Sequence, residues 1–359
     1  MRFIFFSKSM YDEAPRIRHQ LAELLVKFDH TVIFYQKPVY PFSGSGQLLN
    51  KVISEQVEIR QTKQLIHHQM RLFYCLAQIN AIYESNQISR SLFNLSDNDI
   101  VVNFNYDYYF LRNLFPNNKI ITVINDDFIA QARFFKGKHV QKSLEKVCSF
   151  SDAVLTVSYP LLKQASQWTD KAFLFLPWTK TGYEPSKSNT NRNALLLWAH
   201  IDKRVDLDLL VYILENRKNY EIHIVGPITH NLNEKIQLLN LKYKNLLLFP
   251  SASLDKLNMD HYFCSIIPYK SKVADIEAVT ASNKTFQLMS RGLPLVTFGM
   301  PYFLEHKAIF KAESYQDFCE KLDISYHEFS SLQKDIEELV MLNQPFQRYS
   351  QLVDIISKG

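Results

Sequence analysis

Short runs of apolar and β-branched residues alternate with amphipathic stretches over the whole length of this 359-residue chain. Runs of this kind are typical of buried strands, and the stretches between them have the length and periodicity of helices. The alternation therefore predicts β-α units around mainly parallel sheets. Strands are expected at residues 2–6, 31–35, 100–104, 119–124, 153–157 and 172–176, and a second set at 194–198, 221–225, 246–249, 264–267, 294–298 and 308–310.

The two sets of strands are separated by residues 178–193, WTKTGYEPSKSNTNRN, which are polar and rich in Ser, Thr, Asn and Lys. Such a composition is typical of a linker. We therefore expect an N-terminal Rossmann-like domain over 1–177 and a C-terminal one over 194–340, followed by a helix over 341–359 that can pack back on the N-terminal domain. Apolar residues at roughly helical spacing over about 47–84 predict one or two long helices inserted before the third strand.

Composition excludes several classes of protein. The 47% of apolar residues are enough for large cores, so the chain is not disordered. Glycine contributes only 8 residues, about 2% where ordinary usage is about 7%, which nearly excludes Gly-rich phosphate loops. The four cysteines are scattered and predict reduced thiols rather than a zinc site. No apolar run approaches the roughly 20 residues of a membrane span, and we expect a cytoplasmic protein.

The formal net charge of +5 is unevenly distributed along the chain. Residues 1–180 hold 21 Lys and Arg against 15 Asp and Glu, whereas residues 181–359 hold 20 against 21. The excess in the first half can mark a face towards anionic lipid or an acidic acceptor, and a solvated surface of mixed charge is the alternative. No basic run of the kind that binds nucleic acid occurs, so no nucleic-acid partner is expected.

Residues 266–294, IIPYKSKVADIEAVTASNKTFQLMSRGLP, place a buried strand, a polar loop, a helix start and a Gly-Leu-Pro stop in order. Ser282 or Asn283 can cap the helix, and Lys284 would lie in its first turn. Free backbone N–H groups at a helix start, together with a lysine, suit an anion such as a phosphate. An ordinary capped helix with an exposed lysine is the alternative.

The same residues resemble a known family. SNKTFQLMSRGLPLV is similar to the S-N-K-L-F-E-Y-L-A-A-G-L-P-V-V pattern of GT-B-fold glycosyltransferases of the broad family 4 type. The resemblance continues in IVGP at 224–227, SDAVLTVSYPLL at 151–162 and FLFLPW at 173–178, in the same order and with similar spacing along nearly the full chain. It implies an α/β protein of two Rossmann-like domains that face each other across a cleft.

The resemblance also implies where the substrates bind. In this family the donor diphosphate lies chiefly on the second domain and the acceptor on the first. By position, Asn283 and Lys284 would bind the donor phosphates, and Ser282 and Gly226 would belong to the same donor site.

Residues 200–210, HIDKRVDLDLL, resemble the loop and helix start where this family places a lysine and a neighbouring arginine. Those two cations neutralise the leaving pyrophosphate, and here the candidates are Lys203 and Arg204. Fixed cations stabilise the negative charge that develops on the leaving group without a metal. A solvated helix start is the alternative for either residue.

The chain departs from the family pattern at several positions. The glutamate that binds the ribose hydroxyls is replaced by Gln287, which can still form hydrogen bonds but carries no charge. Its partner glutamate falls on Val279, and Glu277 can take that place. The glycine-rich turns after the first strand of each domain are missing, since SKSMYDEAPR at 7–16 and WAHIDKR at 198–204 occupy them. Because of these departures, the sequence does not decide which donor is bound or whether the protein is an active enzyme.

In the first domain, Asp126 and Asp127 follow the strand at 119–124 and are expected at its carboxyl end, where open α/β sheets bind their ligands. One of them could accept the proton of the acceptor hydroxyl in an inverting reaction, or position the sugar in a retaining one. A polar loop or a helix cap is the alternative.

Arg16, Arg18 and His19 belong to the first loop and helix of the same domain. They would face the acceptor side of the cleft and contact the acceptor or a phosphate. An exposed basic helix face is the alternative.

The expected protein is a glycosyltransferase without metal or cofactor that transfers a sugar from a nucleoside diphosphate to a saccharide acceptor. The acceptor is expected to be lipid-linked, in the synthesis of a bacterial surface polysaccharide such as lipopolysaccharide or capsule, with peripheral contact to the inner face of the membrane. The resemblance implies retention of the anomeric configuration. A catalytically inactive binding subunit of the same fold, which Gln287 and Val279 favour, and a nucleotide-sugar epimerase are the alternatives.

Overall fold

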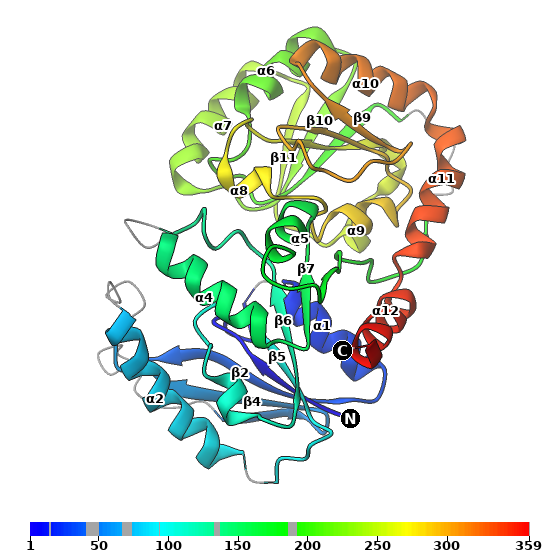
Figure 1. Ribbon diagram of the computed structural model, residues 1–359. Helices are drawn as coiled ribbons and strands as arrows, with labels where there is room; N and C mark the ends of the chain where they lie inside the picture. Colours follow the sequence, from blue (N-terminus) through cyan, green and yellow to red (C-terminus); the bar gives the residue numbers. More distant parts are fainter. Residues whose placement is uncertain are drawn as a thin grey trace. The chain divides into compact units, whose positions relative to one another are not determined.

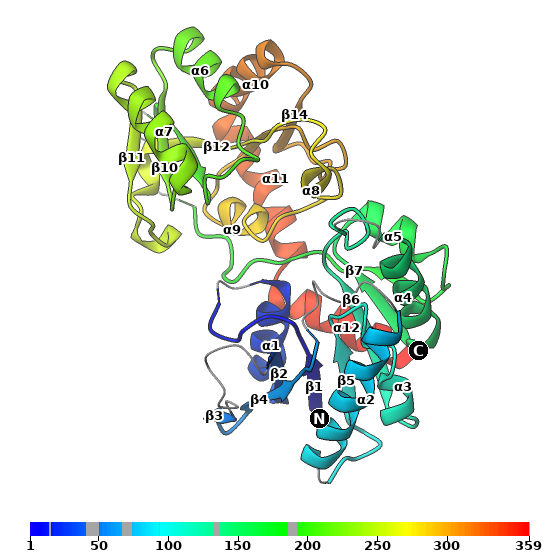
Figure 2. The ribbon, with the colours of Figure 1, turned by 90° about the vertical axis from the view of Figure 1, so that its left-hand side faces the viewer.

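The computed structural model describes residues 1–13, 16–40, 50–66, 74–92, 94–132, 137–185 and 192–358. The chain divides into two compact units: unit 1 comprises Met1–Leu176 together with Arg348–Gly359, and unit 2 comprises Pro177–Gln347. Unit 1 is therefore assembled from two separate segments of the chain, and unit 2 from the segment between them. Each unit contains one sheet with helices packed against it (Figures 1 and 2).

The sheet of unit 1 has the strand order β3-β4-β2-β1-β5-β6-β7-β8. Neighbouring strands are parallel except for β3 and β4, which are antiparallel. The chain starts in the middle of this sheet at β1 and builds outwards on both sides, so the strand order reverses between β1 and β5. The strands are β1 (Arg2–Phe6), β2 (Thr31–Val39), β3 (Lys51–Ser54), β4 (Val57–Lys63), β5 (Ile100–Asn103), β6 (Lys119–Ile124), β7 (Ala153–Thr156) and β8 (Ala172–Leu174).

Helices cover both faces of this sheet, which explains why its central strands β1, β5, β6 and β7 are almost entirely buried. Ile4 and Phe6 of β1 pack in one buried cluster with side chains of α2, α3 and α4. On the opposite face Phe5 lies 5.9 Å from Phe34, measured between ring centres, and His19 of α1 stacks on Phe34. The helices are α1 (Ile17–Lys27), α2 (Tyr74–Ser91), α3 (Leu111–Leu114), α4 (Gly137–Phe150), α5 (Tyr159–Ala165) and most of α12 (Pro345–Lys358).

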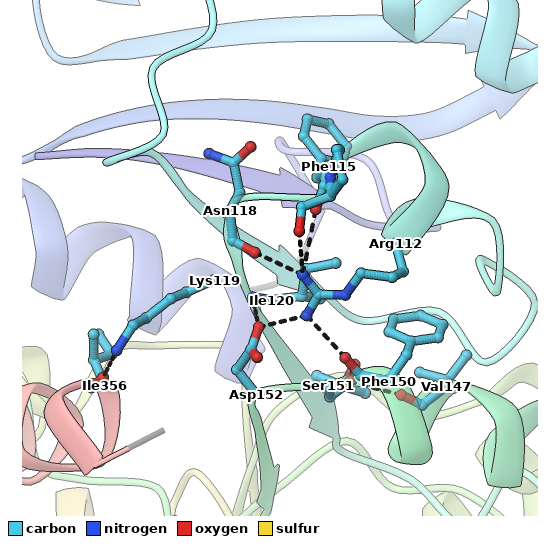
Figure 3. A network of polar contacts seen from close by, with 12 residues as sticks. Arg112, Phe115, Asn118, Lys119, Ile120, Val147, Phe150, Ser151, Asp152 and Ile356 are labelled. Atoms are coloured by element: carbon cyan, nitrogen blue, oxygen red, sulfur yellow. Dashed lines mark hydrogen bonds and ion pairs between the residues drawn. The ribbon is translucent and has the colours of Figure 1, made fainter.

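Arg112 of α3 connects several elements of unit 1 near the start of β6 (Figure 3). Its guanidinium donates to the carbonyls of Asn118 and Phe150, each at 2.9 Å, and to a carboxylate oxygen of Asp152 at 2.6 Å. Asp152 in turn accepts the backbone N–H of Ile120 at 2.8 Å. One side chain thus satisfies polar groups at the ends of α3, α4, β6 and β7.

The last helix of the chain packs on unit 1 through its residues from Arg348 onwards. The ring of Tyr349 stacks on Phe28 with 3.9 Å between centres, and its hydroxyl lies 2.7 Å from Nε2 of His30. Lys119 donates to the carbonyl of Ile356 at 2.6 Å, which places a cation at the C-terminal end of this helix (Figure 3).

The predicted helical insertion over about 47–84 is wrong in its first half. Residues Lys51–Ser54 and Val57–Lys63 form the strands β3 and β4, and a helix begins only at Tyr74. In β4 the buried residues Val57, Ile59 and Gln61 recur with the period of two that a strand requires. The spacing of the apolar residues in this short segment is compatible with a helix as well as with a strand. Pairing with β2 makes the segment a strand. Residues 41–49 and 67–73 lie outside the described ranges.

The sheet of unit 2 has six parallel strands in the order β11-β10-β9-β12-β13-β14. Each of them overlaps a strand expected from the sequence. They are β9 (Ala194–Trp198), β10 (Glu221–Val225), β11 (Leu246–Phe249), β12 (Tyr262–Pro268), β13 (Leu295–Phe298) and β14 (Ile309–Ala312). The helices are α6 (Leu207–Asn216), α7 (His230–Lys242), α8 (Ala274–Glu277), α9 (Thr285–Met289), α10 (Tyr315–His327) and α11 (Phe329–Leu342).

Candidate functional site

In unit 2 the strand order reverses between β9 and β12, and the loops that follow these two strands meet at their carboxyl ends. Val205 pairs with Tyr269 in an antiparallel bridge, and the backbone N–H of Lys270 donates to the carbonyl of Arg204 at 2.9 Å. Ligands of open α/β sheets bind at such a reversal. The geometry therefore marks the loops after β9 and β12 as the candidate binding site of this unit.

Arg204 is fixed in this site by Asp202. Its guanidinium makes a two-point contact, with Nε 2.9 Å from one carboxylate oxygen and a terminal nitrogen 2.6 Å from the other. The guanidinium carbon lies 5.8 Å from the centre of the Tyr269 ring. Partial burial disfavours the charge on Asp202, but the hydrogen bonds and charge of Arg204 outweigh it and lower the pKa of this carboxyl. The arginine is thus held in a defined orientation.

Lys284 brings a second cation to the same place. Burial, and then repulsion by Arg204, lower the pKa of its ammonium to about 8, while Asp202 acts in the opposite direction. Only groups that lie near each other interact in this way. Arg204 and Lys284, two of the three predicted cations, therefore share one electrostatic environment with Asp202. Lys203, the other predicted cation of this loop, is exposed.

The helix that follows Lys284 differs from the prediction. Its first residue is Thr285 and its N-cap is Lys284, without a side-chain cap, so neither Ser282 nor Asn283 caps it. The hydroxyl of Thr285 instead accepts the backbone N–H of Ser282 at 3.0 Å and closes a turn before the helix. Because α9 has only five residues, its N-terminus contributes little to anion binding, and the charge comes from the two cations.

Two glycines allow the neighbouring loops to approach this site closely. A Cβ on Gly226, which has φ +146°, would collide with the carbonyl oxygen of Ala199 after β9. A Cβ on Gly299, with φ +79°, would collide with the carbonyl oxygen of Tyr269. Gly226 was expected in the donor site, and the structure places it beside the β9 loop. Gly299 was not singled out, although its place directly after a predicted strand was a usable signal.

A pocket of about 510 Å³ adjoins this region at the carboxyl ends of β13 and β14. Gly299, which touches Tyr269, forms part of its wall. Glu277 also lines the pocket and is exposed, so it is available to a ligand. Three further charged residues line it: Lys272, Lys311 and Glu313. They were missed in the sequence because they lie in a loop and in or directly after a short edge strand without a motif.

The other positions that the family pattern singles out lie around α9. Gln287 is half-buried, and its backbone carbonyl accepts the hydroxyl of Ser290 at 2.8 Å. Val279 packs against the hydrophobic core of unit 2. A charged side chain at position 279 would lose these apolar contacts.

Unit 1 has a second polar site where its own strand order reverses, at the carboxyl ends of β1 and β5. Asn105 donates to the carbonyl of Phe6 at 3.1 Å and so joins the two strand ends. The ammonium of Lys8 lies 2.5 Å from a carboxylate oxygen of Asp107 and 4.6 Å from the centre of the Tyr106 ring. Cations, carboxylates and an aromatic face are combined here, which suits a ligand rich in hydroxyl groups.

The structure separates the three basic residues expected at this site. Arg18 is 5% exposed, donates to the hydroxyl of Ser7 at 3.3 Å, and has its Nε buried without a hydrogen-bond partner. Burial and then Arg16 lower the pKa of Arg18, and Asp126 is among the groups that oppose this. Arg16 is exposed. Both ring nitrogens of His19 engage the backbone, at Arg16 and Met10, so this side chain holds the loop in place.

The two predicted aspartates, Asp126 and Asp127, also have different surroundings. Asp126 lies close enough to Arg18 to influence its pKa and accepts a hydrogen bond from the amide of Asn125 at 2.6 Å. Asp127 accepts the backbone N–H of Ala130 at 2.9 Å and stabilises the turn that follows. Asp126 is therefore the better candidate for contact with a substrate. No group of three His, Cys, Asp or Glu side chains that could hold a metal ion occurs among the residues described.

No protein-family model matches the chain, and no curated protein matches it in sequence. Solved structures match it in fold over its whole length. HepE of Anabaena in complex with UDP matches with a TM-score of 0.69 at 9% identity and 100% coverage of both chains. The apo form of the lipopolysaccharide outer core galactosyltransferase WaaB gives 0.68 at 10% identity and 99% coverage of both chains.

A third structure, that of WaaG, a glycosyltransferase involved in lipopolysaccharide biosynthesis, matches with a TM-score of 0.67 at 14% identity and 100% coverage of both chains. These structures share the GT-B fold. The chain therefore has this fold, and the fold class predicted from its sequence is confirmed.

Proposed function

We propose that this protein is a glycosyltransferase that moves a sugar from a nucleoside diphosphate to a saccharide acceptor. The observation that carries the proposal is the pairing of Arg204 and Lys284 at the strand reversal of unit 2. Lys284 adds positive charge beside the Arg204–Asp202 pair, where a diphosphate would bind in this proposal. The match to HepE, solved with UDP and with UDP and glucose, supports this proposal.

In the proposed reaction, an acceptor oxygen forms a bond to the anomeric carbon of the donor sugar while the bond from that carbon to the phosphate oxygen breaks. The electron pair of the broken bond stays on the phosphate oxygen, and Arg204 and Lys284 stabilise the resulting charge. The proton of the acceptor hydroxyl passes to the departing phosphate if the configuration is retained. The products are a nucleoside diphosphate and a glycoside, and the reaction requires no metal or cofactor.

Unit 1 supplies the groups for the acceptor in this proposal. Arg18 and Lys8 can donate hydrogen bonds to hydroxyl oxygens, and Asp107 and Asp126 can accept them. We further propose a lipid-linked acceptor and a role in bacterial surface polysaccharide synthesis, in a protein of the cytoplasm that meets the inner face of the membrane. The matches to WaaB and WaaG, both named for lipopolysaccharide, support this part.

A second candidate function is that of a catalytically inactive binding subunit with the same fold. It is favoured by Gln287, which offers no charge to a ribose, and by Val279, which belongs to the core. The two functions differ in a measurable property, because only the enzyme cleaves the sugar bond of a nucleotide-sugar.

The experiment is a thermal-shift screen of nucleoside diphosphates against the wild type and three variants. A ligand that binds only the folded state raises the unfolding midpoint. At a free ligand concentration of 100 times the dissociation constant, the free energy of unfolding rises by about 2.7 kcal/mol. We expect Lys284→Ala to lose this shift, Lys284→Arg to keep most of it, and Lys235→Ala, which changes an exposed lysine of α7, to respond like the wild type.

The nucleotide that binds is then offered as its sugar conjugates, and hydrolysis or transfer is followed by chromatography. Absence of any shift in the wild type would contradict the proposed donor site. A shift without cleavage of any conjugate would favour the inactive binding subunit. Cleavage that is lost in Lys284→Ala supports the enzyme.

A further inference from the structure

Helix α2 in unit 1 departs from the pattern of an ordinary surface helix, because its buried face holds Asn80 and Glu84 beside the apolar Ala77, Ala81 and Ile88. Asn80 and Glu84 are only 2% and 1% exposed. On the outer face of the same helix, three apolar side chains are exposed: Ile79 at 46%, Ile82 at 64% and Tyr83 at 36%. Their spacing of three and four residues places them on one stripe of the helix.

The buried polar residues fix this orientation. Asn80 accepts the backbone N–H groups of Leu65 and Ile66 at 2.8 and 2.9 Å. Glu84 accepts hydrogen bonds from the hydroxyls of Thr62 and Tyr108, both at 2.5 Å. Rotation of the helix would carry Asn80 and Glu84 away and leave their donors, among them the buried hydroxyls of Thr62 and Tyr108, without acceptors. The apolar stripe is therefore kept from turning inwards. It remains outside in the folded protein.

A row of lysines lies on the neighbouring helix α4. Lys138, Lys142 and Lys146 follow each other at intervals of four residues, and all three are exposed. Figure 1 shows α2 and α4 beside each other, and a groove of about 600 Å³ lined by residues of both, including Ile82 and Lys146, separates them. No Asp or Glu is found among the residues that line this groove.

We propose that this surface, formed by Ile79, Ile82 and Tyr83 of α2 and by the three lysines of α4, docks the protein on an anionic phospholipid bilayer. Apolar and aromatic side chains next to a lysine row are the arrangement by which peripheral helices enter the headgroup region while the cations attract lipid phosphates. None of the described helices combines the length and the hydrophobicity that a bilayer crossing requires. The surface therefore provides contact with the interface only.

A second copy of the chain fits this surface less well. A symmetric dimer through the same face would bring two lysine rows together, and the groove offers no carboxylate to neutralise them. An anionic bilayer offers phosphates to the lysines and an apolar interior to the side chains of the stripe. The inference deepens the proposed function, because it says how a lipid-linked acceptor would be reached, but its test requires no catalysis.

The test is flotation of the full-length protein with vesicles of phosphatidylcholine alone and of phosphatidylcholine with 30% phosphatidylglycerol. We expect binding to the anionic vesicles only, weakened by 0.5 M salt. Each lysine near an anionic surface contributes roughly a fivefold gain in affinity, so Lys138→Gln with Lys142→Gln should weaken binding by about 25-fold. Ile79→Ser with Ile82→Ser should weaken it at least tenfold, since two apolar side chains then stay in water.

The matched control is Lys235→Gln with Lys244→Gln, which removes the same charge from exposed positions of unit 2 and should bind as the wild type does. Unchanged unfolding midpoints show that the variants are folded. Equal binding to both kinds of vesicle, equal losses in the control, or a dimer that the serine variants dissociate would each overturn the proposal. A nucleotide-dependent thermal shift in a protein that ignores vesicles would leave the glycosyltransferase proposal standing without this surface.

Discussion

The two cations of unit 2 respond differently to the same surroundings. Arg204 is held in place by the carboxylate of Asp202. Lys284 is a weaker base here than an ordinary lysine, because burial and Arg204 lower its pKa to about 8. Near neutral pH, Lys284 is therefore the member of the pair whose charge can change, and a bound anion would favour its protonated form.

This predicts a pH dependence for nucleoside diphosphate binding. In the free protein, Lys284 loses its proton as the pH rises through about 8, whereas a bound diphosphate stabilises the ammonium and raises its pKa. The affinity should thus be highest below pH 8 and should fall by up to about tenfold per pH unit above it. Calorimetric titrations at pH 7, 8, 9 and 10 measure this, with Lys284→Arg as the control that should show a flat profile.

A steep profile in the arginine variant as well would place the titrating group elsewhere. Equal affinity of the wild type at pH 7 and pH 10 would show that the charge of Lys284 does not contribute to binding.

The sequence alone could suggest Lys284 and Arg204 because both lie in stretches that resemble a family pattern. It could not show that the two side chains share one site, since 80 residues separate them and only the pairing of β9 with β12 brings their loops together. Asp202 gave no signal of its own, because an aspartate before a helix is most often a cap. Here Asp206 caps α6, and Asp202 orients the arginine.

Among the elements of unit 1, α3 has only four residues and cannot be stable by itself. Arg112 compensates for this, because its guanidinium reaches carbonyls of α4 and of the turn before β6 as well as Asp152 (Figure 3). A single arginine therefore replaces several backbone hydrogen bonds that short elements leave unformed.

We predict that Arg112→Ala lowers the free energy of unfolding by roughly 2 kcal/mol, because the carbonyls and Asp152 lose their shared donor. Arg90→Ala is the control: Arg90 is exposed on α2, and its removal should change the free energy by less than about 0.5 kcal/mol. Urea unfolding of both variants gives the comparison. Equal stabilities of the two variants would show that the network of Figure 3 contributes little.

The strands of unit 2 and the central strands of unit 1 were predictable because each is a short run rich in apolar and β-branched residues. The hairpin of β3 and β4 was not, because its partner β2 lies outside the local window and its apolar residues fit a helix as well. Glu84 illustrates the same limit. In a helix pattern a glutamate predicts the solvent-exposed face, yet Glu84 is buried and accepts three hydrogen bonds.

At the scale of the whole molecule, the chain leaves unit 1 after Leu176 and returns to it at Arg348. The returning helix is attached by Tyr349, which stacks on Phe28 and lies within hydrogen-bond distance of His30, and by Gln351, which donates to the carbonyl of Leu174 at 2.8 Å. These contacts belong to unit 1 alone, so their loss should lower the stability of unit 1 before that of unit 2.

We predict that Tyr349→Ala lowers the stability of unit 1 by about 2 kcal/mol, since both the aromatic contact and the hydrogen bond disappear. Tyr349→Phe keeps the stacking and should lose only about 1 kcal/mol. Hydrogen exchange followed by mass spectrometry reads each unit separately: protection should fall in peptides of β1, β2 and α1 and stay unchanged in β9, β10 and β12. A uniform loss across both sheets would mean that the two units unfold as one.

The division of unit 1 into two segments also sets an order of events during synthesis. All residues of unit 2 are synthesised before Arg348, so unit 1 still lacks its last helix when the whole segment of unit 2 has been added to the chain. Until that helix arrives, Phe28 and His30 lack their partner Tyr349. The N-terminal unit is therefore made first but finished last, and a nascent chain stalled shortly before Arg348 would present it incomplete to chaperones.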